Sequence, residues 1–279
     1  MLEAPTLTLN DGHTIPQLGL GTWPLKDRAA AEAVASAIQL GYRHIDTAVR
    51  YGNEKGVGQG VRDSGVPREQ LFVTTKLDGK FQGDDKALAG LEESLKRLRF
   101  DYVDLLLIHW PLPKLGKFSS TFRTFKKLQD AGKVRSIGVS NFTPAHLDTL
   151  IDGTGLVPAV NQIEIDPTRP RLAQRAYNEQ RGILTQSWSP LGGGSSVTEL
   201  LKNGVIVQLA ERHERTPGQI VLRWHVQQGL IPLPKSADPA RQAENLAVFD
   251  FELTADDLAA LGTLSLGPDA GVDSDRSGH

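Results

Sequence analysis

Four residues able to carry acid–base chemistry stand at or just after the ends of apolar segments. Asp46, Lys76 and His109 each close a strand-like segment, and Tyr51 follows Asp46 by five residues. A tyrosine hydroxyl ordinarily titrates at about 10, so a neighbouring charge must tune it for proton transfer near neutrality. Lys76 as an ammonium would favour the phenolate, while Asp46 would keep that lysine charged and correctly aimed. His109 would orient a substrate oxygen, so the set suits protonation of the oxyanion that forms when hydride reaches a carbonyl.

Each residue also has an ordinary structural interpretation. Asp46 and Lys76 could form an ion pair that only stabilises the fold, and Tyr51 could be a half-buried loop aromatic. His109, which precedes Trp110 and Pro111, could be a histidine of the core. Convergence of all four side chains at one place is what favours the chemical interpretation.

The elements that must position these residues alternate along the chain. Amphipathic helical patterns separate short apolar runs, which are typical of strands buried on both faces of a parallel sheet. Eight runs fit this description: 18–22, 42–46, 71–76, 103–109, 134–139, 159–163, 183–187 and 230–233. The pattern predicts a (β/α)8 TIM barrel, although a doubly wound open sheet would give a similar alternation. In a barrel, Asp46, Lys76 and His109 would meet at the rim formed by the carboxyl ends of the strands.

The two ends of the chain carry different signals. Residues 7–15 predict a β-hairpin that turns at Asn10-Asp11-Gly12 and closes the bottom of the barrel. The segment from about 267 to 279 is polar and rich in glycine, which indicates a flexible tail lying loosely over the surface. We expect residues 1–279 to form a single domain with this tail.

Bulk composition excludes several classes of function. The formal net charge of -2 gives no pull toward nucleic acid or anionic membranes. The chain has no cysteine, which excludes disulfides, thiolate metal sites and a cysteine nucleophile, and no histidine pair has metal-ligand spacing. No run approaches the roughly 18 apolar residues of a membrane helix, and the first residues lack a signal-like pattern. We expect a cytoplasmic protein without a metal.

Longer motifs show a specific resemblance. The motifs are 46–54 (DTAVRYGNE), Lys76, 107–111 (LIHWP), 138–142 (GVSNF) and 234–236 (PKS). In this order, from about Leu7 to Leu264, the sequence resembles the aldo-keto reductase superfamily. Within this superfamily, the sequence is most similar to the bacterial 2,5-diketo-D-gluconate reductase group. The similarity is carried by residues 42–46, 188–191 and 248–253.

The resemblance implies NADPH as cofactor and roles for eleven further residues. Those near the nicotinamide would be Ser140, Asn141, Gln162 and Trp188, the last stacking on the ring in a place often taken by another aromatic. Those along the phosphates would be Ser189, Leu191 and the glycines after it, then Lys235, Ser236 and Arg241 at the 2′-phosphate. Glu244 and Asn245 would face the adenine. Asp238-Pro239 opens a helix whose N-terminus would also suit a phosphate.

Two features bear on the substrate. Trp23 and Trp110, with Tyr51 and His109, would form the substrate pocket, because aromatic walls suit small carbonyl compounds. Asp166 stands where many relatives have a histidine, outside the four catalytic positions, and would change the charge near the rim.

These observations predict NADPH-dependent reduction of aldehydes, α-dicarbonyls or keto-sugar acids, with Tyr51 as proton donor, by a monomer whose partner is a small carbonyl compound. Two alternatives remain. One is a cofactor-binding, redox-sensing regulatory module with little turnover. The other is a barrel hydrolase that uses Asp46 and Glu164 as paired carboxylates, since one barrel fold supports many chemistries. Tyr51 and Lys55 have the spacing of short-chain dehydrogenases, but no glycine-rich dinucleotide turn accompanies them.

Overall fold

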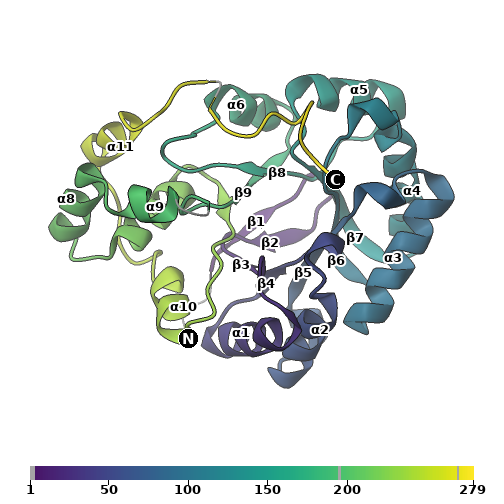
Figure 1. Ribbon diagram of the computed structural model, residues 1–279, viewed down its shortest axis with the longest axis horizontal. Helices are drawn as coiled ribbons and strands as arrows, with labels where there is room; N and C mark the ends of the chain where they lie inside the picture. Colours follow the sequence, from purple (N-terminus) through teal and green to yellow (C-terminus); the bar gives the residue numbers. More distant parts are fainter. Residues whose placement is uncertain (1–3, 194–195, 269) are drawn as a thin grey trace.

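The computed structural model describes residues 4–193, 196–268 and 270–279. Met1–Glu3, Gly194, Ser195 and Asp269 lie outside the described residues, so one glycine of the expected pyrophosphate segment and one residue of the tail are not described. Eight of the described strands form a parallel sheet that curls on itself inside a layer of helices (Figure 1). In chain order its strands are β3 (Leu20–Gly21), β4 (His44–Asp46), β5 (Phe72–Leu77), β6 (Val103–Ile108), β7 (Val134–Ser140), β8 (Val160–Glu164), β9 (Leu184–Trp188) and β10 (Ile231–Pro232).

Backbone hydrogen bonds close this sheet into a barrel. The N–H of Gly19 donates to Pro232 O at 3.2 Å, and the N–H of Gly21 donates to Pro234 O at 3.0 Å. These bonds join the first strand of the sheet to the last, which rules out the open doubly wound alternative. The predicted (β/α)8 barrel is therefore confirmed.

Burial explains why the strands are short and apolar. Every residue of β5 and β6 is buried, because one face packs on the barrel interior and the other on the outer helices. Polar residues that occur within the strands, such as Lys76, must therefore find their partners within the protein rather than in water.

The helices form the outer layer. They are α1 (Asp27–Leu40), α2 (Glu54–Asp63), α3 (Asp84–Leu98), α4 (Phe118–Asp130), α5 (Pro144–Thr154), α6 (Leu172–Gln180), α7 (Ser196–Leu201), α8 (Gly204–Arg212), α9 (Pro217–Gln227), α10 (Pro239–Leu246) and α11 (Ala255–Gly262). Figure 1 shows α10 beside α1, although the two are far apart in the sequence. The Gln242 amide joins them by donating to Ala33 O at 2.9 Å.

The N-terminal hairpin closes one end of the barrel, as predicted. Strands β1 (Thr6–Thr8) and β2 (Thr14–Pro16) pair antiparallel. Leu9 and Ile15 are buried against interior residues of the sheet, and the Asn10 amide donates to Pro158 O just before β8. The hairpin therefore lies at the amino ends of the strands and leaves the carboxyl ends open for a site.

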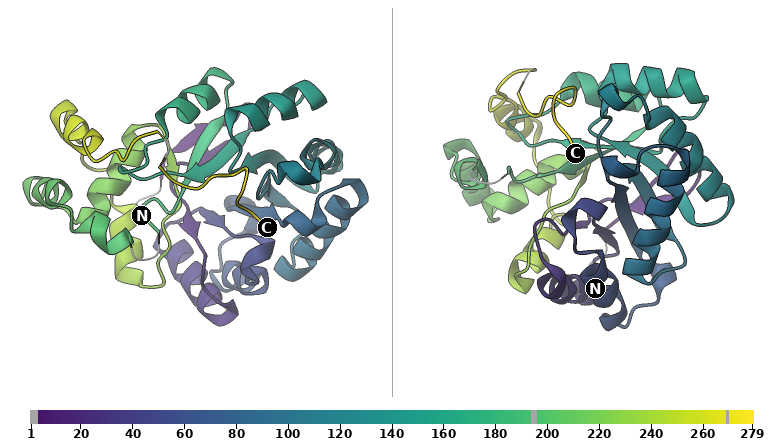
Figure 2. Two further views of the ribbon diagram at one scale, coloured as in Figure 1. Left: turned by 45° about the horizontal axis from the view of Figure 1, so that its top comes forward. Right: turned by 45° about the vertical axis from the view of Figure 1, so that its right-hand side comes forward.

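The C-terminal segment covers part of that opposite end, which the expectation of a loose surface tail did not include. The Val272 N–H donates to the Glu164 carboxylate at 3.2 Å, and Asp275 contacts His146 Nε2 at 2.9 Å. The Gly79 N–H donates to His279 O at 3.1 Å. Both views in Figure 2 show this segment, in yellow, running from α11 across the end of the barrel. No helix in the described ranges is long and apolar enough to cross a membrane.

The close packing of α2 against the end of α3 yields a stability prediction. A Cβ at Gly58 would lie 2.0 Å from Leu98 O. The alanine methyl group of Gly58→Ala can therefore be accommodated only if the backbones of α2 and α3 move apart. We expect this variant to lower the free energy of unfolding by about 1–3 kcal/mol. Chemical denaturation measures the difference. Gly204→Ala, where no atom lies within 4 Å of the new methyl group, is the matched control and should unfold like the native chain. Equal stability of both variants would contradict the packing argument.

Candidate active site

The carboxyl ends of three neighbouring strands bring the predicted acid–base residues together. Asp46 ends β4, Lys76 is the penultimate residue of β5, and His109 directly follows β6. A short 3-10 helix, η1 (Val49–Tyr51), carries Tyr51 back over the barrel. Lys76 Nζ lies 2.5 Å from Asp46 Oδ1 and 3.2 Å from the Tyr51 hydroxyl, and the Tyr51 and His109 rings are 5.8 Å apart, edge to face.

The Lys76–Asp46 ion pair is fully enclosed. Lys76 has no exposed surface, and Asp46 is 3% exposed. A buried charge is stable only where hydrogen bonds replace water. Here, Lys76 also donates to Thr47 O at 3.0 Å, and the Gln162 amide donates to Asp46 Oδ2 at 2.9 Å.

Opposing effects act on the proton of Tyr51. Burial raises the pKa of this phenol above its ordinary value, the charge of Lys76 opposes the rise, and Asp46 adds to it. The sequence predicts a lowering by Lys76, and that contribution is present. Burial outweighs the effect of Lys76, so the pKa of Tyr51 is raised overall and the phenol stays protonated at neutral pH.

The surroundings of Lys76 and His109 also set the protonation states of these two residues. Burial by itself lowers the pKa of Lys76, but Asp46 and Tyr51 outweigh burial and raise it, so the ammonium persists. Burial lowers the pKa of His109 well below its ordinary value, and Lys76 acts in the same direction. His109 is therefore a neutral imidazole near neutrality, able to donate a hydrogen bond without carrying charge.

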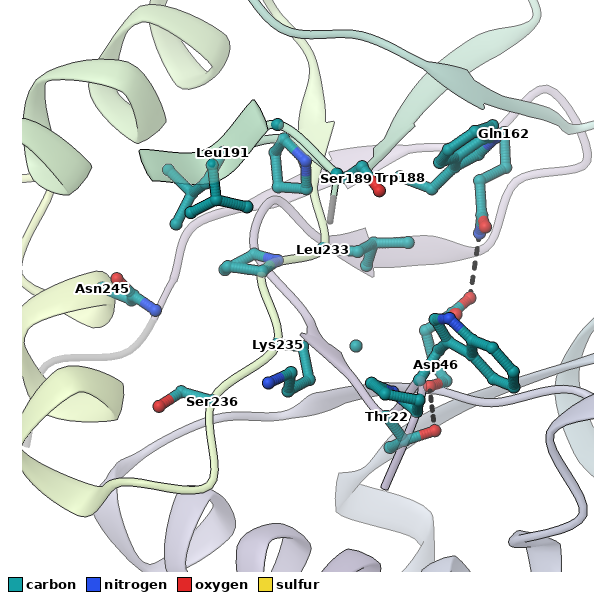
Figure 3. A pocket seen from close by; sticks show the side chains of 18 of the residues that line it. Thr22, Asp46, Gln162, Trp188, Ser189, Leu191, Leu233, Lys235, Ser236 and Asn245 are labelled. Carbon is teal, nitrogen blue, oxygen red and sulfur yellow. Dashed lines mark hydrogen bonds between the residues drawn. The ribbon is translucent and has the colours of Figure 1, made fainter. Parts of the chain in front are cut away.

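A large cavity of about 1070 Å³ opens above these residues (Figure 3). Its lining includes Asp46, Tyr51 and His109, whereas Lys76 lies beneath it. The expected substrate residues Trp23 and Trp110 also line it. So do all eleven expected cofactor residues: Ser140, Asn141, Gln162, Trp188, Ser189, Leu191, Lys235, Ser236, Arg241, Glu244 and Asn245. The structure thus brings every predicted site residue to one cavity or directly beneath it, while their individual roles remain predictions.

At one end of the cavity, hydrogen bonds hold the amide-bearing side chains in place. The Asn141 amide donates to His109 O at 3.0 Å and to Ser140 Oγ at 3.1 Å. Trp188 Nε1 donates to Asn141 Oδ1 at 2.9 Å, which fixes the indole. These contacts connect the expected nicotinamide end directly to the backbone of His109.

At the other end, the predicted phosphate site needs a correction. Asp238 caps α10, and its Oδ1 accepts the N–H groups of Ala240 at 2.9 Å and Arg241 at 3.4 Å. The N-terminal N–H groups of this helix are therefore satisfied by the chain itself. The side chains of Lys235 and Arg241, rather than free helix N–H groups, are what remain to attract a phosphate.

Among the cavity residues that sequence reasoning missed, two have ionisable side chains. Arg50 lines it beside Tyr51, and its position in the same short turn was an available signal. His279 lines it as well, with its ring 5.2 Å from that of His109. No local sequence pattern predicts that His279 lines the cavity, because its position depends on the path of the whole C-terminal segment.

Two carboxylates near the rim have structural partners. Asp166, the departure from the family pattern, is buried and pairs with Arg169 at 2.8 Å while accepting the Thr168 N–H at 2.7 Å. Glu164 binds the Val272 N–H and is not among the cavity-lining residues. The arrangement gives no support to a hydrolase that uses Asp46 and Glu164 as a pair.

Comparison with known proteins identifies the family. The Aldo/keto reductase family model matches residues 17–265. The chain belongs to the aldo-keto reductase family. It is 49% identical to 2,5-diketo-D-gluconic acid reductase B of Corynebacterium sp. over 96% of this chain and 95% of the relative. It is 44% identical to methylglyoxal reductase DkgA of Salmonella typhimurium over the full length of both. The predicted family resemblance is confirmed.

A solved structure supports the same assignment. A point mutant of Gox0644 in complex with NADPH has a TM-score of 0.93, 43% identity and 99% coverage of both chains. A match over this length includes the barrel and the segments that form the cavity. The barrel fold is therefore shared with this solved structure over nearly the whole length of both chains.

The opposing effects on Tyr51 give a prediction about proton binding. Lys76→Met removes the contribution that lowers the pKa of Tyr51, so its phenolate should form at more alkaline pH than in the native chain. The near-ultraviolet phenolate signal measures this, with Tyr51→Phe variants subtracted to isolate one tyrosine. Because the change leaves Asp46 buried without its cation, Asp46→Asn/Lys76→Met is the companion variant should the single one unfold. A titration unchanged from the native one would refute this account of the site.

Proposed function

We propose that this chain, an NADPH-dependent oxidoreductase of the aldo-keto reductase family, reduces small α-dicarbonyl compounds and keto-sugar acids to alcohols, with Tyr51 as proton donor. The observation that carries the proposal is the Tyr51 hydroxyl, which lies at the cavity and 3.2 Å from the buried ammonium of Lys76. The alternative of a regulatory module with little turnover has no specific contact in its favour.

The protonation states suit reduction. Tyr51 holds its proton at neutral pH because burial raises its pKa, so it can give that proton to a developing alkoxide. Lys76 stabilises the phenolate that remains, and Asp46 keeps Lys76 charged. Neutral His109 can donate a hydrogen bond to the substrate oxygen and hold it toward Tyr51.

The cavity residues fit NADPH by their chemistry. Trp188 offers an indole face for a planar ring, and Ser140, Asn141 and Gln162 offer amide and hydroxyl groups for a carboxamide. Lys235 and Arg241 supply cations at the other end, suited to a 2′-phosphate. When bound, the reduced coenzyme supplies the hydride, and Tyr51 supplies the proton that completes the alcohol.

The residues at the mouth of the cavity support this substrate class. Trp23 is 54% exposed and lies 5.3 Å from the Tyr51 ring, and Trp110 stands on the His109 side. Aromatic walls of this kind accept small carbonyl compounds of varied shape. Relatives named as methylglyoxal and 2,5-diketo-D-gluconic acid reductases support α-dicarbonyls and keto-sugar acids as the first compounds to test.

Removal of the Tyr51 hydroxyl tests the mechanism. We expect Tyr51→Phe to lower kcat/KM for methylglyoxal by about 100-fold or more, because positioned proton donors contribute roughly that much. The rate of NADPH oxidation measures the effect. Tyr102→Phe is the control, since Tyr102 OH bonds Arg135 away from the cavity. Full activity in Tyr51→Phe would exclude Tyr51 as the donor.

The cations at the phosphate end generate a second prediction. Arg241 is 70% exposed in its side chain and only loosely paired with Asp238 at 3.5 Å, so it is free to turn toward a phosphate. Arg241→Ala should raise the Kd for NADPH about tenfold and leave that for NADH nearly unchanged. Quenching of tryptophan fluorescence measures both constants. Arg28→Ala removes another exposed arginine and should alter neither. An equal loss for both coenzymes would show that Arg241 does not read the 2′-phosphate.

A further inference from the structure

Two buried amide side chains stand next to each other beneath the cavity. Gln162 on β8 and Gln186 on β9 are register partners of neighbouring parallel strands. Gln162 Nε2 donates to Gln186 Oε1 at 3.0 Å, and both residues are almost without exposed surface. Gln162 reaches the cavity, whereas Gln186 is not among its lining residues. Any effect of Gln186 on the cavity must therefore pass through its contact with Gln162.

The charge on Asp46 fixes the orientation of both amides. Asp46 is ionised beside the Lys76 ammonium, and an ionised carboxylate only accepts hydrogen bonds. The nitrogen of Gln162, not its oxygen, must therefore face Asp46 Oδ2, as the dashed line in Figure 3 shows. The second N–H of that nitrogen points to Gln186, which must present its oxygen.

This orientation leaves Gln186 with an unsatisfied group. Its Nε2 is buried, and the described residues offer it no hydrogen-bond acceptor. A buried donor without a partner destabilises a fold, whereas an apolar side chain of the same shape does not. The cost of the unpartnered nitrogen offsets the stability that the Gln186 oxygen contributes by accepting the Gln162 N–H, so stability gives little reason for an amide at position 186. The contact that the amide does make, to the nitrogen that holds Asp46, points to a role in the site.

We propose that Gln186 is a positioning residue that locks the Gln162 amide onto Asp46 and so holds Asp46 and Lys76 in the arrangement from which Tyr51 donates its proton. The inference rests on the proposed role of Tyr51 as proton donor. Without the Gln186 oxygen, the Gln162 amide can rotate, and Asp46 Oδ2 loses a fixed donor. The charge of Asp46 is then less well compensated, and this charge raises the pKa of Tyr51.

Gln186→Met, which keeps the volume and removes the acceptor, tests the proposal. We expect kcat for methylglyoxal reduction to fall about fivefold to tenfold, the scale of one lost hydrogen bond. The Kd for NADPH should rise by no more than a similar factor, because Gln186 lies outside the cavity lining and reaches the coenzyme only through the Gln162 amide. The Tyr51 phenolate should form at more alkaline pH, measured against Gln186→Met/Tyr51→Phe. Thermal stability should stay close to native, because the change removes one buried unpartnered donor, the Gln186 nitrogen, but leaves the second N–H of Gln162 without its acceptor.

Two further variants separate positioning from structure. Gln186→Glu keeps an oxygen toward Gln162, and burial beside Asp46 keeps that glutamic acid neutral, so its kcat should be closer to native than that of Gln186→Met. Gln17→Met removes another buried amide, which bonds Val226 O and Leu230 O. It should lose thermal stability while keeping native kcat and the native Tyr51 titration.

The outcomes divide clearly. Native kcat and an unmoved Tyr51 titration in Gln186→Met would overturn the proposal, as would a loss of stability and rate together without a change in that titration. If the native chain reduces none of the carbonyl compounds, the proposed function fails by itself. The Tyr51 titration, which needs no turnover, then still decides whether Gln186 acts on the site.

Discussion

The buried ion pair between Lys76 and Asp46 is the constraint on which the site depends. Two charges inside a barrel are stable only if they meet each other and enough further hydrogen-bonding groups to replace water. Strands β4 and β5 supply the pair, and Thr47 O and the Gln162 amide complete its shell. These partners come from opposite sides of the barrel. The charged pair is therefore fully hydrogen-bonded only when the barrel is closed.

The same burial that makes the pair expensive also sets the state of the phenol above it. A low-polarity surrounding disfavours a phenolate, and a nearby ammonium favours it. At Tyr51 the first effect exceeds the second, so the proton is retained until a stronger base develops next to it. The neutral His109 ring adds a hydrogen-bond donor without a further charge. The site therefore suits proton delivery more than proton removal.

The sequence predicted what local patterns control. Apolar runs located the eight strands, and the residues at their carboxyl ends, such as Asp46 and Lys76, identified the acid–base group. Local patterns could not reveal contacts between distant segments. Gln162 meets Asp46 across 116 positions of sequence, and His279 lies beside His109 where contacts of the last segment with Gly79, His146 and Glu164 hold it. The predicted helix N-terminus for a phosphate was wrong in detail because Asp238, taken only as the start of the helix, is also its cap.

That cap separates coenzyme choice from the integrity of the fold. Because Asp238 caps α10, the first N–H groups of this helix have partners within the chain and need none from a ligand in the cavity. If Arg241 reads the 2′-phosphate as proposed, discrimination between phosphorylated and unphosphorylated coenzymes depends on a solvent-facing side chain, 70% exposed, that can be exchanged without disturbing the core. In a barrel of this kind, evolution or engineering can change the preference between the two coenzymes through surface substitutions, without altering the residues around Tyr51.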